Sequence, residues 1–348
     1  MLPGRNLKAY IARFRHASAP ELAYRAGLAL RIRKLRATVS AGRRFVEIPA
    51  LDAAEIRGMQ LPAFILDTDE SAIGEILGGR VFTLGEEQQA VERFERETKD
   101  KYFADVRSGP TSPDIRTVWE PARLQHITTL LLYARANPGL DGFDAVRDFA
   151  RKGLLEWLRK HPFLKGPHYM SPMECGLRIP VFFYALRLLD NLTPEERQEI
   201  LEALYLHAWW VSRNLSLHSS LGNHTICECV GLVFAGGVFK SAPEGRSWLS
   251  KSIELLRQEI NHQILDDGGP AEQSLGYHRF VLDLYRLAVG FLERNALWDC
   301  RELKPRLELG EAFLATFRDD AGNAPDIGDC DGGHAVAPGI RPERFVER

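Results

Sequence analysis

Cysteine is scarce in this sequence of 348 residues, and its cysteines form no pattern. An odd number spread thinly along the chain predicts no disulfide framework. Residues 227 and 229 would point about 200° apart on a helix, which disfavours joint chelation of a metal with His224 and Glu228. We therefore expect neither a metal nor a cofactor. The cysteines are Cys175, Cys227, Cys229, Cys300 and Cys330.

The sequence also lacks long apolar runs and an excess of charge of one sign. Its longest apolar runs are too short to cross a bilayer. With 45 Lys and Arg against 47 Asp and Glu, the net charge is -2, which gives no general attraction to nucleic acid. Residues 1–27 are basic but have no continuous apolar core, so they do not resemble a signal peptide. This indicates a cytoplasmic protein, with a periplasmic or exported location as the alternative; the oligomeric state stays open.

Strand-like alternation is scarce, and GRVFTLG (79–85) is the best candidate. Apolar residues instead recur at spacings of three and four, the period of an amphipathic helix. Thr193, Pro194 and Glu196 have the pattern of a capped helix start. Because short loops join long helices, the sequence predicts an all-α fold of helical hairpins closing into a toroid, with a plain solenoid as the alternative. Helices are expected at residues 119–136, 143–160, 172–189, 194–214, 225–239, 246–264, 272–294 and 304–317.

The domain organisation follows from where this helical pattern is clear. Residues 1–116 are expected to form an N-terminal helical arm and the first helices of the toroid. Residues 117–318 would be the toroid core, with a substrate cleft. After residue 318 the chain is rich in Gly, Asp and Pro and has no helical period, so residues 319–348 are predicted to be an irregular linker.

Polar residues gather where one apolar helix begins. Asn223 and His224 stand at this start, where backbone N–H groups point outward and the helix dipole favours negative charge. An anion such as a carboxylate would be well placed there. The structural alternative is that Asn223 only caps the helix and that His224 is an ordinary loop residue. Thr225 and Glu228 have the spacing of a capping box.

A second helix start has the same character. In DDGGPAEQSLGYHRF (266–280) a glycine-rich turn leads to Gln273, Tyr277 and His278. A buried tyrosine could simply pack, but the polar turn before it favours a cleft wall.

Two more clusters contain charged side chains. Glu174 and Arg178 lie four residues apart, which fits an ion pair within a helix or a fixed guanidinium for a carboxylate or sugar hydroxyls. In WEPARLQH (119–126), Trp119 stands beside Glu120 and Arg123. This combination is typical of a site where a sugar ring stacks on an aromatic side chain, and it is equally typical of an ordinary domain surface.

Four segments together resemble the N-terminal helical domain of the heparinase II/III-like polysaccharide lyases, a group that includes heparin lyases and oligoalginate lyases. They are WEPARLQH, LKGPHYMSPMECGLRI (164–179), RNLSLHSSLGNHTICECVGL (213–232) and DDGGPAEQSLGYHRF. PDIGDCDGG (325–333) is similar to the segment that ends that domain. The resemblance implies an incomplete (α/α) toroid followed by an antiparallel β-sandwich domain that is absent here. The family takes at least one catalytic or substrate-binding histidine from that second domain, and no residue of this chain can be assigned to the role.

The resemblance implies β-elimination on an acidic polysaccharide or oligosaccharide. Donors must offset the uronate charge, while a base removes the C5 proton and an acid protonates the leaving oxygen. By this analogy Asn223 neutralises the carboxylate, Tyr277 is the acid and also a candidate base, and His224 is the base or a second carboxylate donor. The isolated chain should be weakly active or inactive, because part of the expected site is missing. The residues expected to line the cleft are Glu120, Arg123, Glu174, Arg178, Gln273 and His278.

Two other functions stay open. A glycoside hydrolase on a similar toroid would need two carboxyl groups, about 6.5–9.5 Å apart for inversion. No spacing singles out such a pair among Glu120, Glu174, Asp267 and Glu272. A non-catalytic helical module would bind a polysaccharide or a partner protein. The sequence distinguishes neither one uronate polymer from another nor an endo from an exo mode of cleavage.

Overall fold

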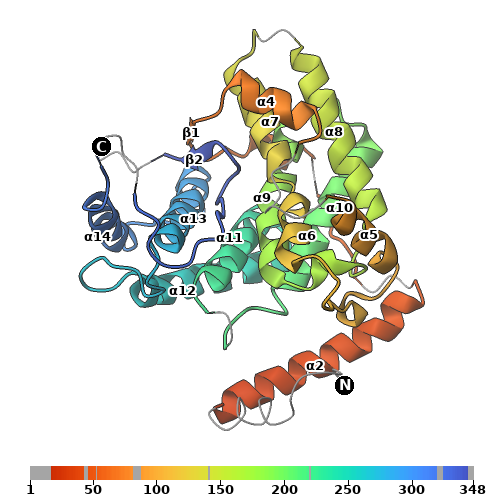
Figure 1. Cartoon of the computed structure of the whole chain (residues 1–348), viewed down its shortest axis with the longest axis horizontal. Coiled ribbons are helices and arrows are strands. Elements are labelled where there is room, and N and C mark those ends of the chain that lie inside the picture. The colour runs from red at the N-terminus through yellow and green to blue at the C-terminus, as the bar shows by residue number, and fades with distance from the viewer. Residues whose placement is uncertain are drawn as a thin grey trace. The chain divides into compact units, whose positions relative to one another are not determined.

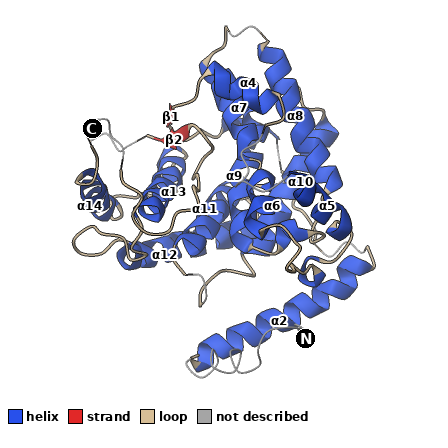
Figure 2. Ribbon diagram, viewed as in Figure 1, coloured by secondary structure: helices blue, strands red, loops and turns tan. Residues whose placement is uncertain are grey.

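Most of the regular structure in this protein is helical, as Figure 2 shows. Contacts group the chain into two compact units, residues 1–47 and residues 48–348. In the first unit, α2 (Ala19–Ser40) begins where the Ser18 hydroxyl accepts a hydrogen bond from the backbone N–H of Glu21. The computed structural model describes residues 17–42, 46–51, 53–80, 88–139, 142–218, 221–319 and 324–343.

The second unit is a succession of helices close to those predicted, which confirms the all-α class. The capping box at Thr193 and Glu196 is present at the start of α10. The strand candidate at 79–85 falls largely outside the described residues. The helices are α3 (Ala53–Gly58), α4 (Glu70–Leu77), α5 (Gln88–Thr98), η1 (Phe103–Asp105), α6 (Ile115–Ala122), α7 (Gln125–Ala136), α8 (Phe143–Lys160), η2 (Pro167–Tyr169), α9 (Pro172–Leu188), α10 (Pro194–Val211), α11 (Asn223–Val238), α12 (Pro243–Gln263), α13 (Leu275–Arg294) and α14 (Lys304–Ala315).

The single helix predicted for residues 119–136 is in fact two helices. Pro121 has no N–H to donate within α6, and the helix ends one residue later. Leu124 then adopts a left-handed backbone conformation, with φ of 61°, before α7 starts. The break places Arg123 at the end of α6, where its side chain can reach another helix.

The helices from α7 onward pair into hairpins whose first members form an inner row. The helices α7, α9, α11 and α13 contact one another in this order, while α8 contacts α10 and α12 contacts α14 (Figure 1). Every residue of α11 except His224 is buried, as expected for an inner helix. This arrangement is the incomplete (α/α) toroid that the sequence predicted. Each outer helix returns the chain to the side on which the preceding inner helix began. The inner helices therefore all begin on the same side of the row.

Two glycines let the central inner helices approach closely. A Cβ on Gly231 of α11 would lie 2.6 Å from the carbonyl oxygen of Gly176 in α9. A Cβ on Gly176 would lie 3.0 Å from the carbonyl oxygen of Cys227. Only residues without a side chain fit this contact, which brings the first turns of α9 and α11 near each other.

The tail after α14 returns to the helical unit. Strand β2 (Ile340–Pro342) pairs antiparallel with β1 (Phe64–Leu66). On α7, Gln125 donates a hydrogen bond to the carbonyl of His334 and Thr129 donates one to the carbonyl of Pro338. The tail is therefore attached to the helical unit through β2 and through its contacts with α7.

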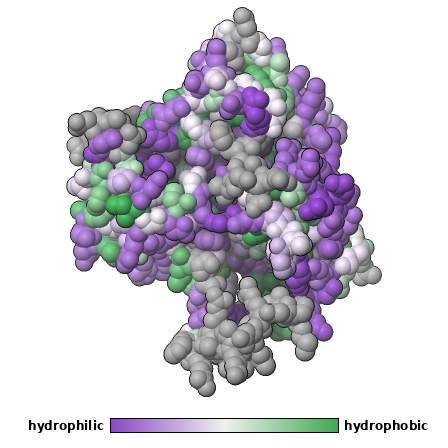
Figure 3. Space-filling view, viewed as in Figure 1, coloured by the Kyte–Doolittle hydropathy of each residue, from purple (hydrophilic) through white to green (hydrophobic). Residues whose placement is uncertain are grey.

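The face of the molecule seen in Figure 3 is largely hydrophilic, with hydrophobic atoms gathered over α14. Leu265, Leu309 and Phe317 are exposed large apolar side chains from α14 and its surroundings. Among the described residues, no helix combines the length and apolar character that a membrane span requires.

Candidate functional site

A cavity of about 350 Å³ lies where the inner helices begin. Its walls come from α6, from the first turns of α9, α11 and α13, and from the tail around residue 331. All four polar clusters of the sequence contribute to it, although they are far apart along the chain. The polar lining includes Arg116, Arg123, Glu174, Asn223, His224 and Tyr277.

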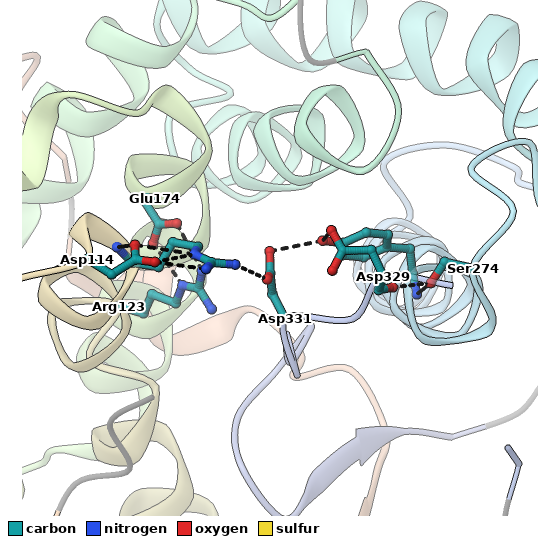
Figure 4. Close-up of polar contacts among 8 residues, drawn as sticks. Asp114, Arg123, Glu174, Ser274, Asp329 and Asp331 are labelled. Carbon is teal, nitrogen blue, oxygen red and sulfur yellow. Dashed lines mark hydrogen bonds and ion pairs between the residues drawn. The ribbon is translucent and has the colours of Figure 1, made fainter. Parts of the chain in front are cut away.

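A tail carboxylate lies in the middle of the polar contacts at this cavity (Figure 4). Asp331 Oδ1 is 2.6 Å from Nη1 of Arg116, and Asp331 Oδ2 accepts a hydrogen bond of 2.9 Å from the Tyr277 hydroxyl. Asp329 Oδ2 lies 3.4 Å from the same hydroxyl. Ser274, the N-cap of α13, donates to the backbone carbonyl of Asp329. The tail thus joins α6 to the start of α13 across the cavity.

Asn223 is the first residue of α11, and both of its N–H groups face a carboxylate. Its backbone N–H and its side-chain Nδ2 each donate to Glu272 at 2.7 Å. The preceding Gly222 has a φ of 101°, which residues with a side chain rarely adopt. Asn223 therefore presents two parallel donors at a helix N-terminus, an arrangement that binds a carboxylate.

Glu174 pairs with Arg123 and not with Arg178. The two groups form a two-pronged contact, with Nε–Oε2 at 2.8 Å and Nη2–Oε1 at 2.9 Å. Both side chains are largely buried. Although burial favours a higher pKa for Glu174, the Arg123 guanidinium outweighs it and holds the pKa below the usual value. Glu174 is thus an ionised partner that keeps Arg123 in position.

The two candidate proton carriers are expected to differ in protonation. Burial lowers the pKa of His224, although the nearby carboxylates of Glu174 and Glu272 oppose the shift. The imidazole is therefore neutral at neutral pH and can accept a proton. Burial and the hydrogen bond to Asp331 raise the pKa of Tyr277, so its hydroxyl keeps its proton. A neutral imidazole and a protonated tyrosine hydroxyl thus line the same cavity.

Two residues expected in the cleft lie in the packed interior instead. Arg178 is fully buried and donates to the carbonyl of Ala122 and to Nε2 of His207. Its guanidinium carbon also lies 5.1 Å from the centre of the Trp157 ring. The ring nitrogen Nε2 of His278 is 3.0 Å from the carbonyl oxygen of Gly310, which fixes α13 against α14. The expectation that Arg178 and His278 bind substrate is therefore corrected: both hold the helices together.

The two remaining expected residues lie outside the cavity lining. Gln273 is exposed, and its φ of 52° places it in the left-handed region of the turn before α13. Glu120 is half-buried near Arg123, and burial raises its pKa. Its Oε2 atom is buried without a hydrogen-bond partner among the described residues.

Three polar residues of the cavity were not among the functional candidates that the sequence indicated. Arg116 stands one helical turn before the recognised WEPARLQH segment. Asp331 belongs to the tail that was assigned as a linker, although the density of Asp and Gly in PDIGDCDGG could have signalled it. Glu272 was considered only as a hydrolase carboxylate, while its contact is with Asn223. Each of these three side chains contacts a partner at least 49 positions away in the sequence, and local spacing does not reveal such contacts.

The predicted capping box of Thr225 and Glu228 does not form. The Thr225 hydroxyl donates to the carbonyl of Ser216, and Glu228 accepts bonds of 2.7 Å from both the backbone N–H and the hydroxyl of Ser216. These contacts fasten the segment before α11 onto the helix itself. Burial, partly opposed by the two Ser216 bonds, raises the pKa of the Glu228 carboxyl to about 8.

Glu228 should make folding stability depend on pH. Because its pKa is higher in the folded protein than in the unfolded chain, its contribution is fully present below the ordinary value near ~4.5. That contribution should be lost as pH rises through about 8. We expect Glu228→Gln to melt at a temperature that varies less than wild type between pH 5 and 8.5. Melting curves of both proteins and of Glu254→Gln, an exposed control on α12, measure this. Parallel curves for wild type and Glu228→Gln would contradict the assignment.

Comparison with known proteins adds to this geometry. Residues 148–299 match the model of the Heparinase II/III N-terminus family. A heparin-sulfate lyase from Bacteroides stercoris is 29% identical over 165 residues, covering 41% of this chain and 24% of that protein. A heparin-sulfate lyase from Bacteroides thetaiotaomicron is 32% identical over 81 residues, covering 23% of this chain and 11% of that protein.

A solved structure shares the fold. A crystal structure of heparinase III superimposes with a TM-score of 0.54 at 15% identity, covering 85% of this chain and 45% of that one. The chain thus spans less than half the length of the relatives that it matches. The matched residues 148–299 include all of α9 to α13, which carry Glu174, Asn223, His224 and Tyr277. The family match and the curated relatives therefore support a heparinase II/III-like family for this chain, as its sequence indicated.

Proposed function

We propose that this chain forms the helical wall of the active site of a lyase that cleaves uronate-containing polysaccharide by β-elimination. The observation that carries the proposal is the convergence of Asn223, His224 and Tyr277 on one cavity. Asn223 supplies hydrogen-bond donors for a carboxylate, His224 supplies a neutral base and Tyr277 supplies a protonated acid. Elimination needs these three groups. Their contacts and protonation support the roles that are proposed below.

The substrate carboxylate would be bound where three helix N-termini meet. The first turns of α9, α11 and α13 line the cavity, and their dipoles favour negative charge there. Arg116 and Asn223 already contact carboxylates, those of Asp331 and Glu272. A uronate carboxylate would take the place of one of these. Its charge would then be offset, which makes the neighbouring C5 proton easier to remove.

Proton transfer would use His224 and Tyr277. The neutral imidazole of His224 accepts the C5 proton, and the electron pair of that bond forms the C4=C5 double bond. The C4–O bond breaks as the Tyr277 hydroxyl gives its proton to the leaving glycosidic oxygen. The raised pKa keeps the Tyr277 hydroxyl protonated and disfavours the tyrosinate, so the alternative role of Tyr277 as the base is less favoured.

The substrate class is narrowed by the cavity and by the relatives. Trp119 lines the cavity with its indole nitrogen bonded to the carbonyl of Pro167, so the ring is held as a flat platform for a sugar. The curated relatives are named heparin-sulfate lyases. A sulfated, uronate-containing polysaccharide is therefore the first substrate to test, with alginate as the unsulfated alternative.

The test measures product chemistry and binding together. The chain is incubated with heparan sulfate, alginate and neutral dextran, and the ultraviolet absorbance of the conjugated 4,5-double bond is followed. Calorimetry measures affinity for oligosaccharides of the same polymers. We expect binding of the acidic sugars and not of dextran, with slow appearance of the absorbance. Turnover should be slow because one wall alone positions the substrate poorly. Good orientation can remove ~7–11 kcal/mol of the activation barrier, and much of that would be lost.

Other results would favour the alternatives. New reducing ends without ultraviolet absorbance would indicate a glycoside hydrolase. Binding of acidic sugars with neither product, even at high protein concentration, would indicate a non-catalytic binding module. Equal binding of dextran and acidic sugars would contradict the proposal as a whole.

A further inference from the structure

A second cluster of functional groups lies away from the cavity just described. Glu95 projects from α5, His161 follows the last residue of α8, and His168 belongs to η2. One carboxylate oxygen and one ring nitrogen from each histidine lie within 4.8 Å of one another. His161 and His168 are both buried, and Glu95 is partly exposed. The proposed lyase chemistry uses none of these three residues.

His168 is the least satisfied polar side chain of this cluster. It is completely buried, and neither of its ring nitrogens makes a well-aligned hydrogen bond within the described structure. Its Nε2 atom is 3.1 Å from Oε1 of Glu95, and its ring meets that of His161 edge to face at 4.5 Å. A buried imidazole without aligned partners is costly, and binding of a cation by a ring nitrogen would remove that cost.

The backbone holds the two histidines in place independently of any ligand. Phe103 N–H donates to the carbonyl of Leu164 at 3.0 Å, and Gly166 N–H donates to the carbonyl of Lys101 at 2.9 Å. These bonds join the loop between α8 and η2 to the segment that follows α5. The Tyr169 hydroxyl donates to the carbonyl of His161, which links the two histidine-bearing segments directly.

Two cavities adjoin the cluster at Glu95 and His161. Glu95 and His161 line a cavity of about 480 Å³ together with Glu92, Lys99 and Lys160. A ligand entering this cavity would meet the carboxylate and the imidazole first, with His168 behind them. The two lysines would favour an anion or a hydroxide as a further ligand on a bound cation.

We infer that Glu95, His161 and His168 form a binding site for a divalent transition-metal ion, with Zn²⁺ the best fit. Two imidazoles and one carboxylate are a common three-ligand set for Zn²⁺, which leaves a fourth position for water. Bonds of ~2.0–2.1 Å place tetrahedral ligands roughly 3.3 Å apart, so the side chains must draw in by about 1–1.5 Å. The site departs from the expectation of no metal, because its ligands come from segments that no short motif joins.

The test compares Glu95→Gln with Glu92→Gln. Both positions lie on α5 and line the same cavity, but only Glu95 belongs to the cluster. Protein freed of metal with a chelator is titrated with ZnCl₂ in a calorimeter, and the visible spectrum of the Co²⁺ form reports the geometry. We expect one Zn²⁺ per chain and a tetrahedral Co²⁺ spectrum. Glu95→Gln should weaken binding by at least the ~10–100-fold that loss of a supporting partner costs, and Glu92→Gln should bind as wild type does.

The remaining outcomes would overturn the inference. Failure of wild type to bind Zn²⁺ at millimolar concentration would do so. Equal affinities of Glu95→Gln and wild type would also exclude this site. A Cys330→Ser variant identifies adventitious binding, since Cys330 is an exposed thiol; loss of all Zn²⁺ binding in that variant would locate the metal elsewhere. Melting temperatures with and without Zn²⁺ provide a second readout that needs no activity, because only a protein that binds the ion is stabilised by it.

Discussion

Replacement of Tyr277 by phenylalanine is expected to lower kcat for uronate elimination by ~10²–10⁴-fold, the usual scale of general acid–base catalysis. The change keeps the ring on α13 and removes the hydroxyl that donates to Asp331 at 2.9 Å. The leaving oxygen would then lack its proton donor, while the groups that bind the carboxylate stay in place. Single-turnover rates with protein in excess over oligosaccharide, read from the ultraviolet absorbance of the product, measure the effect.

Tyr285 provides a matched control on the same helix. Its hydroxyl donates to the carbonyl of Leu256 in the buried interior, so Tyr285→Phe should cost about 1 kcal/mol of stability. It should leave the elimination rate unchanged. If Tyr277→Phe eliminates at the wild-type rate while remaining folded, Tyr277 is not the acid, and the hydroxyl only fastens the tail to α13.

Replacement of Arg123 by methionine is expected to lower the free energy of unfolding by ~3–5 kcal/mol, because it leaves a buried carboxylate without its partner. Glu174 is 3% exposed at its side chain, and both of its oxygens accept hydrogen bonds from Arg123. Methionine can fill much of the space of the arginine stem, so the loss is chiefly electrostatic. Urea unfolding at neutral pH measures the change.

Two further variants separate the charge effect from general damage. The double variant Arg123→Met/Glu174→Met removes both charges and should recover much of the lost stability, as apolar replacements of buried pairs often do. Arg159→Met breaks an exposed pair with Glu199 and should leave the free energy of unfolding almost unchanged. A similar small cost for Arg123→Met would show that water reaches Glu174 and that the pair is not isolated from solvent.

Local pattern was sufficient to predict the helices from α8 to α14, each of which begins within about three residues of the predicted start. The capping residues of α10 and the glycine-rich turn before α13 act on their immediate neighbours, so their consequences can be predicted from spacing alone. The prediction was wrong at residues 119–136, where Pro121 and the left-handed Leu124 divide one apolar pattern into two helices. Backbone breaks of this kind depend on packing as well as on sequence.

Partners were harder to predict than positions. Spacing was compatible with an ion pair between Glu174 and Arg178 or with a guanidinium that binds substrate. The capping-box spacing suggested that Glu228 would cap α11. In the structure Glu174 meets Arg123 from α6, and Glu228 holds Ser216. Arg178 is instead surrounded by backbone carbonyls and aromatic rings in the interior. A long polar side chain takes whichever partner the packing brings near, and the contacts within one helix are only weakly favourable.

The sequence by itself determined that this protein is built from helical hairpins and that polar groups stand where several inner helices begin. Apolar spacing and capping act over a few residues and therefore appear directly in the sequence. Only the tertiary structure decided which groups meet: it placed the tail residue Asp331 between Arg116 and Tyr277, and it joined Glu95 to two histidines beside a separate cavity. These contacts follow from how the hairpins stack and where the chain returns, because the partners are brought together by burial of helix faces many residues apart.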